Sequence, residues 1–159
     1  MRKLLFNKIN TIMKTYSFEN LDVWKFSRQL VKQVYEVQST FPPFERYGLG
    51  DQLRRAVVSI SSNIAEGNAR SSVKEQIHFL EISKGSLMEV YCQLLLAYDL
   101  SYIDEEQLSD CKVKIDVVYK LLNGLLYHKF NILSNSNSQV INPKSQVPSP
   151  KSQVLSHKS

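Results

Sequence analysis

Glu75 and His78 have the spacing that most directly suggests catalytic chemistry in this chain. A Glu-x-x-His pair places both side chains on one helical face, and helical bundles that hold two metal ions use that spacing. Such a centre needs two pairs, but the other histidine within the helical region, His128, follows Leu125 at that spacing. We therefore expect no metal site and no cofactor, with His78 in solvent.

Nucleophilic chemistry is equally poorly supported. Cys92 and Cys111 form no CxxC pair, and both fall in apolar stripes, where a free thiol is usually a small buried hydrophobic residue. Free thiols of this kind are typical of proteins from the reducing cytoplasm. Ser59, Ser61 and Ser62 lie in neither a G-x-S-x-G nor an S-x-x-K pattern, and the five glycines form no phosphate-binding loop. We expect a protein that is not an enzyme.

Clustered basic side chains are the stronger functional signal. Arg54 and Arg55 are the centre of the cluster, and the other candidates for binding a nucleic-acid backbone are Arg46, Arg70, Lys74, Lys25, Arg28 and Lys32. Guanidinium groups match the geometry of phosphate, which favours RNA or DNA binding. Nearby carboxylates (Glu45, Asp51, Glu66 and Glu75) offer the alternative that the cations are neutralised locally.

Small and polar residues run through residues 54–67. We interpret this stretch as a surface on which a second helix packs closely, with Asn63 bonding across to that helix, Gly67 among the small residues and the Gly85-Ser86 pair as the partner. The alternative is that Asn63, Glu66 and Glu89 line a polar binding site. Gly67 is also expected to end its helix in the left-handed conformation.

Apolar periodicity of 3.6 residues predicts helices over residues 21–39, 50–67, 72–98 and 104–129. Ser72 with Glu75 and Asp104 with Gln107 have the spacing of capping boxes at two of the helix starts. Short connections make antiparallel neighbours, so the fold is predicted to be all-α, an up-down-up-down four-helix bundle.

The charge is unevenly distributed around that bundle. Residues 1–16 carry four basic and no acidic side chains, residues 131–159 carry three and none, and residues 17–130 carry 13 basic and 15 acidic side chains. We predict a basic N-terminal extension over 1–16, the bundle over 17–130, and a disordered tail over 131–159 with a seven-residue repeat rich in Ser and Pro. No stretch is apolar enough for a membrane span.

The two last helices have more apolar surface than one core needs. Leu94, Leu95 and Leu96 are successive and span about 200° of a helix, so they cannot all face inward. A surplus apolar stripe usually marks a subunit interface, and we predict a homo-oligomer.

Five segments of the chain form a recognisable series. They are residues 18–24 (FENLDVW), 41–49 (FPPFERYGL), 52–56 (QLRRA), 59–67 (SISSNIAEG) and 79–86 (FLEISKGS). Together they resemble the bacterial 23S rRNA-intervening-sequence proteins. The resemblance implies a bundle that assembles into a homopentameric ring, with Arg54 and Arg55 at recurrent arginine positions of the family. It also implies similarity to the accessory proteins of diversity-generating retroelements, basic pentamers that bind nucleic acid and a reverse transcriptase.

The resulting hypothesis is a non-enzymatic, cytoplasmic, homo-oligomeric bundle that binds structured RNA. The alternative is a protein-interaction scaffold, whose apolar helix faces bind a protein partner and whose arginines are neutralised by local carboxylates.

Overall fold

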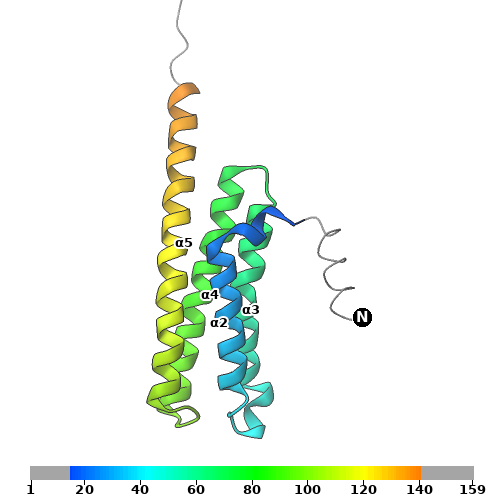
Figure 1. Ribbon diagram of the computed structural model, residues 1–159, viewed down its shortest axis with the longest axis vertical. Coiled ribbons are helices and arrows are strands. Elements are labelled where there is room, and N and C mark those ends of the chain that lie inside the picture. Colours follow the sequence, from blue (N-terminus) through cyan, green and yellow to red (C-terminus); the bar gives the residue numbers. More distant parts are fainter. Residues whose placement is uncertain (1–14, 141–159) are drawn as a thin grey trace, which may run out of the picture.

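The computed structural model describes residues 15–140, and four long helices make up most of them (Figure 1). The elements are η1 (Ser17–Asn20), α2 (Asp22–Gln38), η2 (Pro43–Tyr47), α3 (Leu49–Asn68), α4 (Val73–Asp99) and α5 (Glu105–Val140). No strand occurs within residues 15–140, so the prediction of an all-helical protein with four helices is confirmed.

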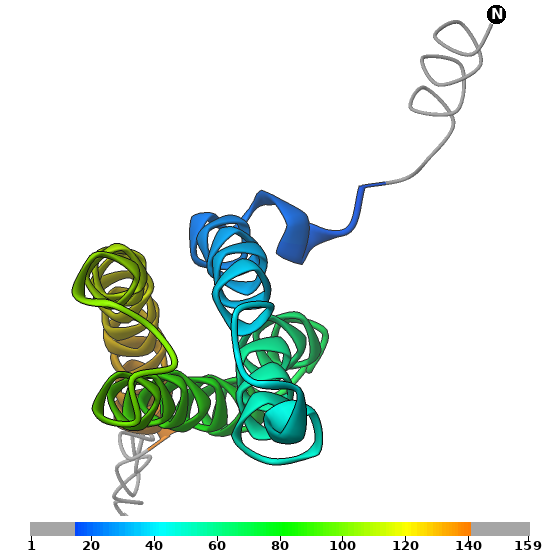
Figure 2. The same ribbon diagram turned by 90° about the horizontal axis from the view of Figure 1, so that it is seen from below.

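The helices enclose a common core. Figure 1 shows that each helix starts near the end of the molecule at which the preceding helix stops. Helix α2 packs against α3 and α5, and α4 packs against the same two helices, an arrangement seen end-on in Figure 2. Each helix therefore needs two buried strips and leaves an outer face to solvent.

The core forms where the apolar stripes meet. Its fully buried large side chains include Leu30, Val34, Leu53, Val57, Ile60, Leu87, Leu94, Val118 and Leu122. Burying each such side chain stabilises the fold by about 1.5–3 kcal/mol. Leu94 is fully buried whereas Leu95 and Leu96 are exposed, as the helical geometry predicted.

Helices α3 and α4 approach each other closely through small residues. The Ser83 hydroxyl donates a hydrogen bond to the Ile60 carbonyl oxygen at 3.0 Å, and the Ser59 and Ser86 hydroxyls share one at 2.9 Å. A methyl group on Gly67 would lie only 2.9 Å from Cβ of Phe79. The predicted close packing is therefore confirmed at Ser86 and Gly67.

The predictions for Gly85 and for the end of α3 are wrong. A Cβ atom on Gly85 would meet no atom within 4 Å, because this glycine faces away from α3. Gly67 does not adopt a positive φ, and α3 continues past it to Asn68. Gly67 is required because a side chain there would overlap Phe79, and the helix needs no left-handed residue at this position.

Only one of the two expected capping boxes forms. The backbone N–H of Gln107 donates to Asp104 Oδ1 at 2.8 Å, and the Asp104 N–H donates to Gln107 Oε1 at 3.0 Å, which fixes the start of α5. Ser72 precedes α4, but its side chain makes no capping hydrogen bond. The Gln76 side chain instead donates to the Arg70 carbonyl oxygen at 2.6 Å and closes the α3–α4 connection.

Helix α5 is longer than predicted. It continues to Val140 rather than ending near Lys129, and its last part projects beyond the other helices (Figure 1). Leu133 packs against the core, so the apolar pattern does not stop at residue 130. The expected disorder from residue 131 is thus wrong for 131–140, while residues 1–14 and 141–159 of the predicted extensions lie outside the described part.

Replacing Gly67 with alanine should destabilise the protein by about 1–3 kcal/mol, because the new methyl group overlaps Phe79 and the backbone of α4. Gly124→Ala is the matched control: nothing lies within 4 Å of the added atom, and alanine is the better helix former by about 1 kcal/mol. Urea unfolding measures both. Equal stabilities for the two variants would contradict the close packing of α3 on α4.

Candidate nucleic-acid interface

Arg54 lies near the start of α3 and bonds residues of two neighbouring elements. Its guanidinium donates to Gln38 Oε1 of α2 at 3.0 Å and to the carbonyl oxygen of Arg46 in η2 at 2.9 Å. An Asp51 carboxylate oxygen lies 3.5 Å away, and only 26% of the Arg54 side chain is exposed. Arg54 therefore joins α2, η2 and α3, which limits what it can offer to a ligand.

Arg55 is the available member of the pair. It also pairs with the Asp51 carboxylate, yet 59% of its side chain is exposed. Asp51 thus faces two guanidinium groups, and this local set keeps one net positive charge. An exposed pair of this kind contributes only about 0–1 kcal/mol to stability, so an incoming anion can compete for Arg55.

Both arginines line a concave region between α2 and α3, which we call the α2–α3 hollow. Its volume is about 530 Å³, and its lining residues are Tyr35, Asp51, Arg54, Arg55, Val58, Ser59 and Ser62. Tyr35 comes from α2, and the other six recur on one face of α3. The hollow combines a guanidinium, a carboxylate, hydroxyls and a half-exposed aromatic ring.

The three candidate cations of α2 are paired or stacked locally. Lys25 lies 3.1 Å from an Asp22 carboxylate oxygen, and Lys32 lies 3.8 Å from that of Glu36. The guanidinium carbon of Arg28 lies 4.8 Å from the centre of the Trp24 ring. Arg28 and Lys32 precede Tyr35 by seven and three residues, so they share its side of α2.

The remaining candidates lie at opposite ends of the bundle. Arg46 is in η2 with its guanidinium 5.9 Å from the Tyr47 ring, whereas Arg70 follows the far end of α3. Arg70 pairs with Glu66 and lies 4.7 Å from the Phe79 ring, and exposed Lys74 follows it in α4. Arg54 lies 14 residues before the end of α3 at Asn68, about 21 Å along the helix, and Arg70 follows that end. The structure therefore splits the predicted cluster into two groups.

Glu45, a carboxylate expected to neutralise the arginines, has other partners. It accepts hydrogen bonds from the Leu49 backbone N–H at 2.8 Å and from the Tyr102 hydroxyl at 3.1 Å. Burial and the contact with Glu45 raise the pKa of Tyr102 above its ordinary value. Glu45 thus ties η2 to the α4–α5 connection, while Asp51 and Glu66 are the carboxylates that pair with arginines.

The three residues proposed for a polar lining belong to separate hydrogen-bonded sets. The Asn63 side chain donates to the carbonyl oxygen and hydroxyl of Ser59 at 2.8 and 2.9 Å, within the α3–α4 contact. Glu66 is exposed beside Arg70, and exposed Glu89 accepts from Gln93 at 3.0 Å. The expectation that Asn63 bonds across to a second helix is wrong, because its hydrogen bonds stay within α3, and it shares no polar lining with Glu66 and Glu89.

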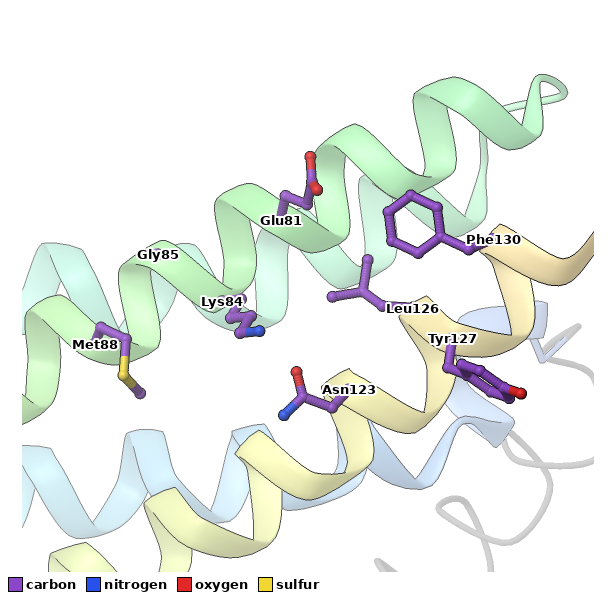
Figure 3. Close-up of a pocket in the computed structure, with 8 residues that line it drawn as sticks. All are labelled: Glu81, Lys84, Gly85, Met88, Asn123, Leu126, Tyr127 and Phe130. Carbon is purple, nitrogen blue, oxygen red and sulfur yellow. The ribbon is translucent and has the colours of Figure 1, made fainter. Parts of the chain in front are cut away.

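A second concave region, the α4–α5 groove, was not predicted as a site from the sequence. Its volume is about 580 Å³, and it is lined by Glu81, Lys84, Gly85, Met88, Asn123, Leu126, Tyr127 and Phe130. In Figure 3, Met88, Lys84 and Asn123 extend into the space between the helices, and Gly85 leaves one wall open. The sequence feature that could have predicted this groove is the surplus of apolar residues on the helices expected at 72–98 and 104–129.

The described residues provide no metal centre. No group of three or more His, Cys, Asp or Glu side chains suited to a metal comes together within residues 15–140. The ring of His78 instead lies edge-on to Phe79, with centroids 5.7 Å apart.

None of the described helices is long and apolar enough to cross a membrane.

These features define a small all-helical bundle protein with a cationic hollow between two helices and an apolar groove between the other two. The profile of the 23S rRNA-intervening sequence protein family matches residues 19–124, and the chain belongs to this family.

One solved structure gives further support for the fold. It is a protein of unknown function from the S23 ribosomal protein family of Bacteroides thetaiotaomicron VPI-5482, solved at 1.70 Å. The TM-score is 0.61 at 22% sequence identity, and the match covers 65% of this chain and 97% of that chain. At this identity the likeness concerns the fold. A comparison with curated proteins finds no match.

Arg54→Met should destabilise the protein by about 1–3 kcal/mol, because Gln38 and the Arg46 carbonyl lose a half-buried donor. Arg55→Met, which removes the same group from an exposed pair, should cost less than about 1 kcal/mol. Urea unfolding of the two variants measures the difference. If Arg55→Met proved the more damaging, the assignment of Arg54 as the anchor would be wrong.

Proposed function

We propose that this protein is a non-enzymatic, cytoplasmic nucleic-acid-binding protein that assembles into a homopentameric ring. It binds structured RNA connected with rRNA intervening sequences. The observation that carries the proposal is the exposed guanidinium of Arg55 in the α2–α3 hollow, beside cations on the same side of α2.

The distribution of charge supports this choice of face. Residues 17–70 hold seven basic and six acidic side chains, whereas residues 71–130 hold six basic and nine acidic ones. Every arginine of the chain precedes residue 71. Arginine is the side chain best suited to phosphate, so α2 and α3 are the half of the bundle that a nucleic-acid backbone would approach.

Self-association is supported by the opposite half. The α4–α5 groove is bordered by Met88 and Phe130, and Leu95 and Leu96 extend the exposed apolar surface along α4. A soluble protein seldom leaves such a surface in water. A ring would also repeat the α2–α3 hollow in every subunit, which multiplies a modest phosphate affinity.

The second candidate is a protein-interaction scaffold without nucleic-acid binding. The pairing of Arg54 and Arg55 with Asp51, and of Arg70 with Glu66, favours it because much of the positive charge is compensated. In that case the α4–α5 groove would hold a helix of another protein.

Arg55→Glu in the full-length chain should weaken binding to a structured ribosomal RNA fragment roughly tenfold. It should also reduce the slope of log K against log salt by about 1, because a phosphate contact is lost. Lys120→Glu makes the same charge change at an exposed position of α5 and should leave the affinity nearly unchanged. Fluorescence anisotropy at several salt concentrations measures both.

Equal losses in the two charge-reversal variants would mean that binding follows total charge rather than a site. No measurable binding by the native chain would favour the scaffold.

The native chain should have a solution mass five times its 18.3 kDa in light scattering. Met88→Glu should reduce that mass, because a charge in the α4–α5 groove opposes burial of the surface. Gln29→Glu adds a charge at an exposed position of α2 and should leave the mass unchanged. A native 18.3 kDa monomer would defeat the assembly.

A further inference from the structure

We infer that the α2–α3 hollow binds an unpaired nucleotide, with its base on the ring of Tyr35 and its phosphate at Arg55. This inference rests on the proposed function and names the part of an RNA that the site recognises.

Tyr35 is the first reason. It is 44% exposed on α2 although it borders the hollow, and no hydrogen bond of its hydroxyl holds it elsewhere in the described structure. Val58 of α3 is likewise 40% exposed in the same lining. An exposed aromatic ring offers an apolar face on which any base can stack, and stacking is a common way to hold single-stranded nucleic acid.

The mixed charge of the hollow is the second reason. Arg55 attracts an anion, and Asp51 beside it accepts hydrogen bonds from donors that the carboxylates of an acidic peptide lack. Carboxylate oxygens have about four acceptor positions in total, so Asp51 can accept further hydrogen bonds while it pairs with the arginines. A nucleotide carries both partners, a phosphate for the guanidinium and base N–H donors for the carboxylate.

The size of the hollow and the hydrogen bond between its two helices suit this ligand. Its volume of about 530 Å³ lies within the roughly 300–1,000 Å³ typical of small-molecule sites. Arg54 of α3 donates a hydrogen bond to Gln38 of α2 and so fixes α2, which carries Tyr35, against α3, which carries Arg55. Arg54 is thus a positioning residue.

Unpaired bases occur in loops and bulges of folded RNA, where they can leave the stack. A duplex keeps its bases paired and offers Tyr35 nothing to stack on. The hollow should therefore distinguish a hairpin loop or a single strand from a blunt duplex. It should accept RNA and DNA strands alike, because base and phosphate are common to both.

The test uses the full-length chain and fluorescence anisotropy with three RNA probes: a single strand, the same strand with abasic sites, and a blunt duplex. A DNA strand of the same sequence is the fourth probe. Tyr35→Ala should weaken binding of the single strand by about five- to a hundredfold, whereas Tyr35→Phe should keep it. With the abasic strand and the duplex, Tyr35→Ala should have no effect.

Tyr98→Ala is the matched control, because Tyr98 is a tyrosine of similar exposure, 41%, on α4 and outside the hollow. Circular dichroism and urea unfolding are the controls that check whether the Tyr35→Ala variant is folded. Single-strand binding that is indifferent to Tyr35→Ala, or an equal loss with the abasic strand, would overturn the inference and leave the proposed function in place. Failure of the native chain to bind any of the probes would overturn both.

Discussion

The close contact between α3 and α4 is the constraint on which the rest of the bundle depends. Ser83 bonds the backbone of α3 directly, and Ser59 and Ser86 bond each other. At Gly67 there is no room for even one methyl group before Phe79 of α4. These contacts fix the relative position of the two helices, so that Leu53, Val57 and Ile60 on α3 and Leu87 on α4 enter one core. Helices α2 and α5 complete that core.

Fixing α3 and α4 in this way also separates the surface into two different halves. On the α2–α3 side, Arg54 donates its hydrogen bonds to Gln38 and the Arg46 carbonyl oxygen. Arg55 is therefore the more exposed cation of the hollow that Tyr35 also lines. On the α4–α5 side, Met88, Leu126 and Phe130 line a groove together with polar residues. The arginine-lined hollow and the apolar groove therefore lie on opposite pairs of helices and share no side chain.

Much of the helical architecture is predictable because it depends on local periodicity. Leu94 faces inward while Leu95 and Leu96 face out, which a rotation of 100° per residue requires. The predicted ends were less accurate, since they depend on single contacts: Ser72 makes no cap, and Leu133 packs on the core beyond the expected end of α5.

The sequence by itself determined four helices, their apolar stripes, the family resemblance and the residue types that suit phosphate, because these follow from periodicity and from the order of residues along the chain. Only the tertiary structure decided which arginine is exposed and which is structural. Arg54 and Arg55 are chemically identical neighbours, and a rotation of 100° points one toward Gln38 and leaves the other more exposed. The place of Tyr35 in the α2–α3 hollow was likewise decided by the tertiary structure, because its distance from Arg55 depends on how α2 packs on α3, which no local pattern encodes.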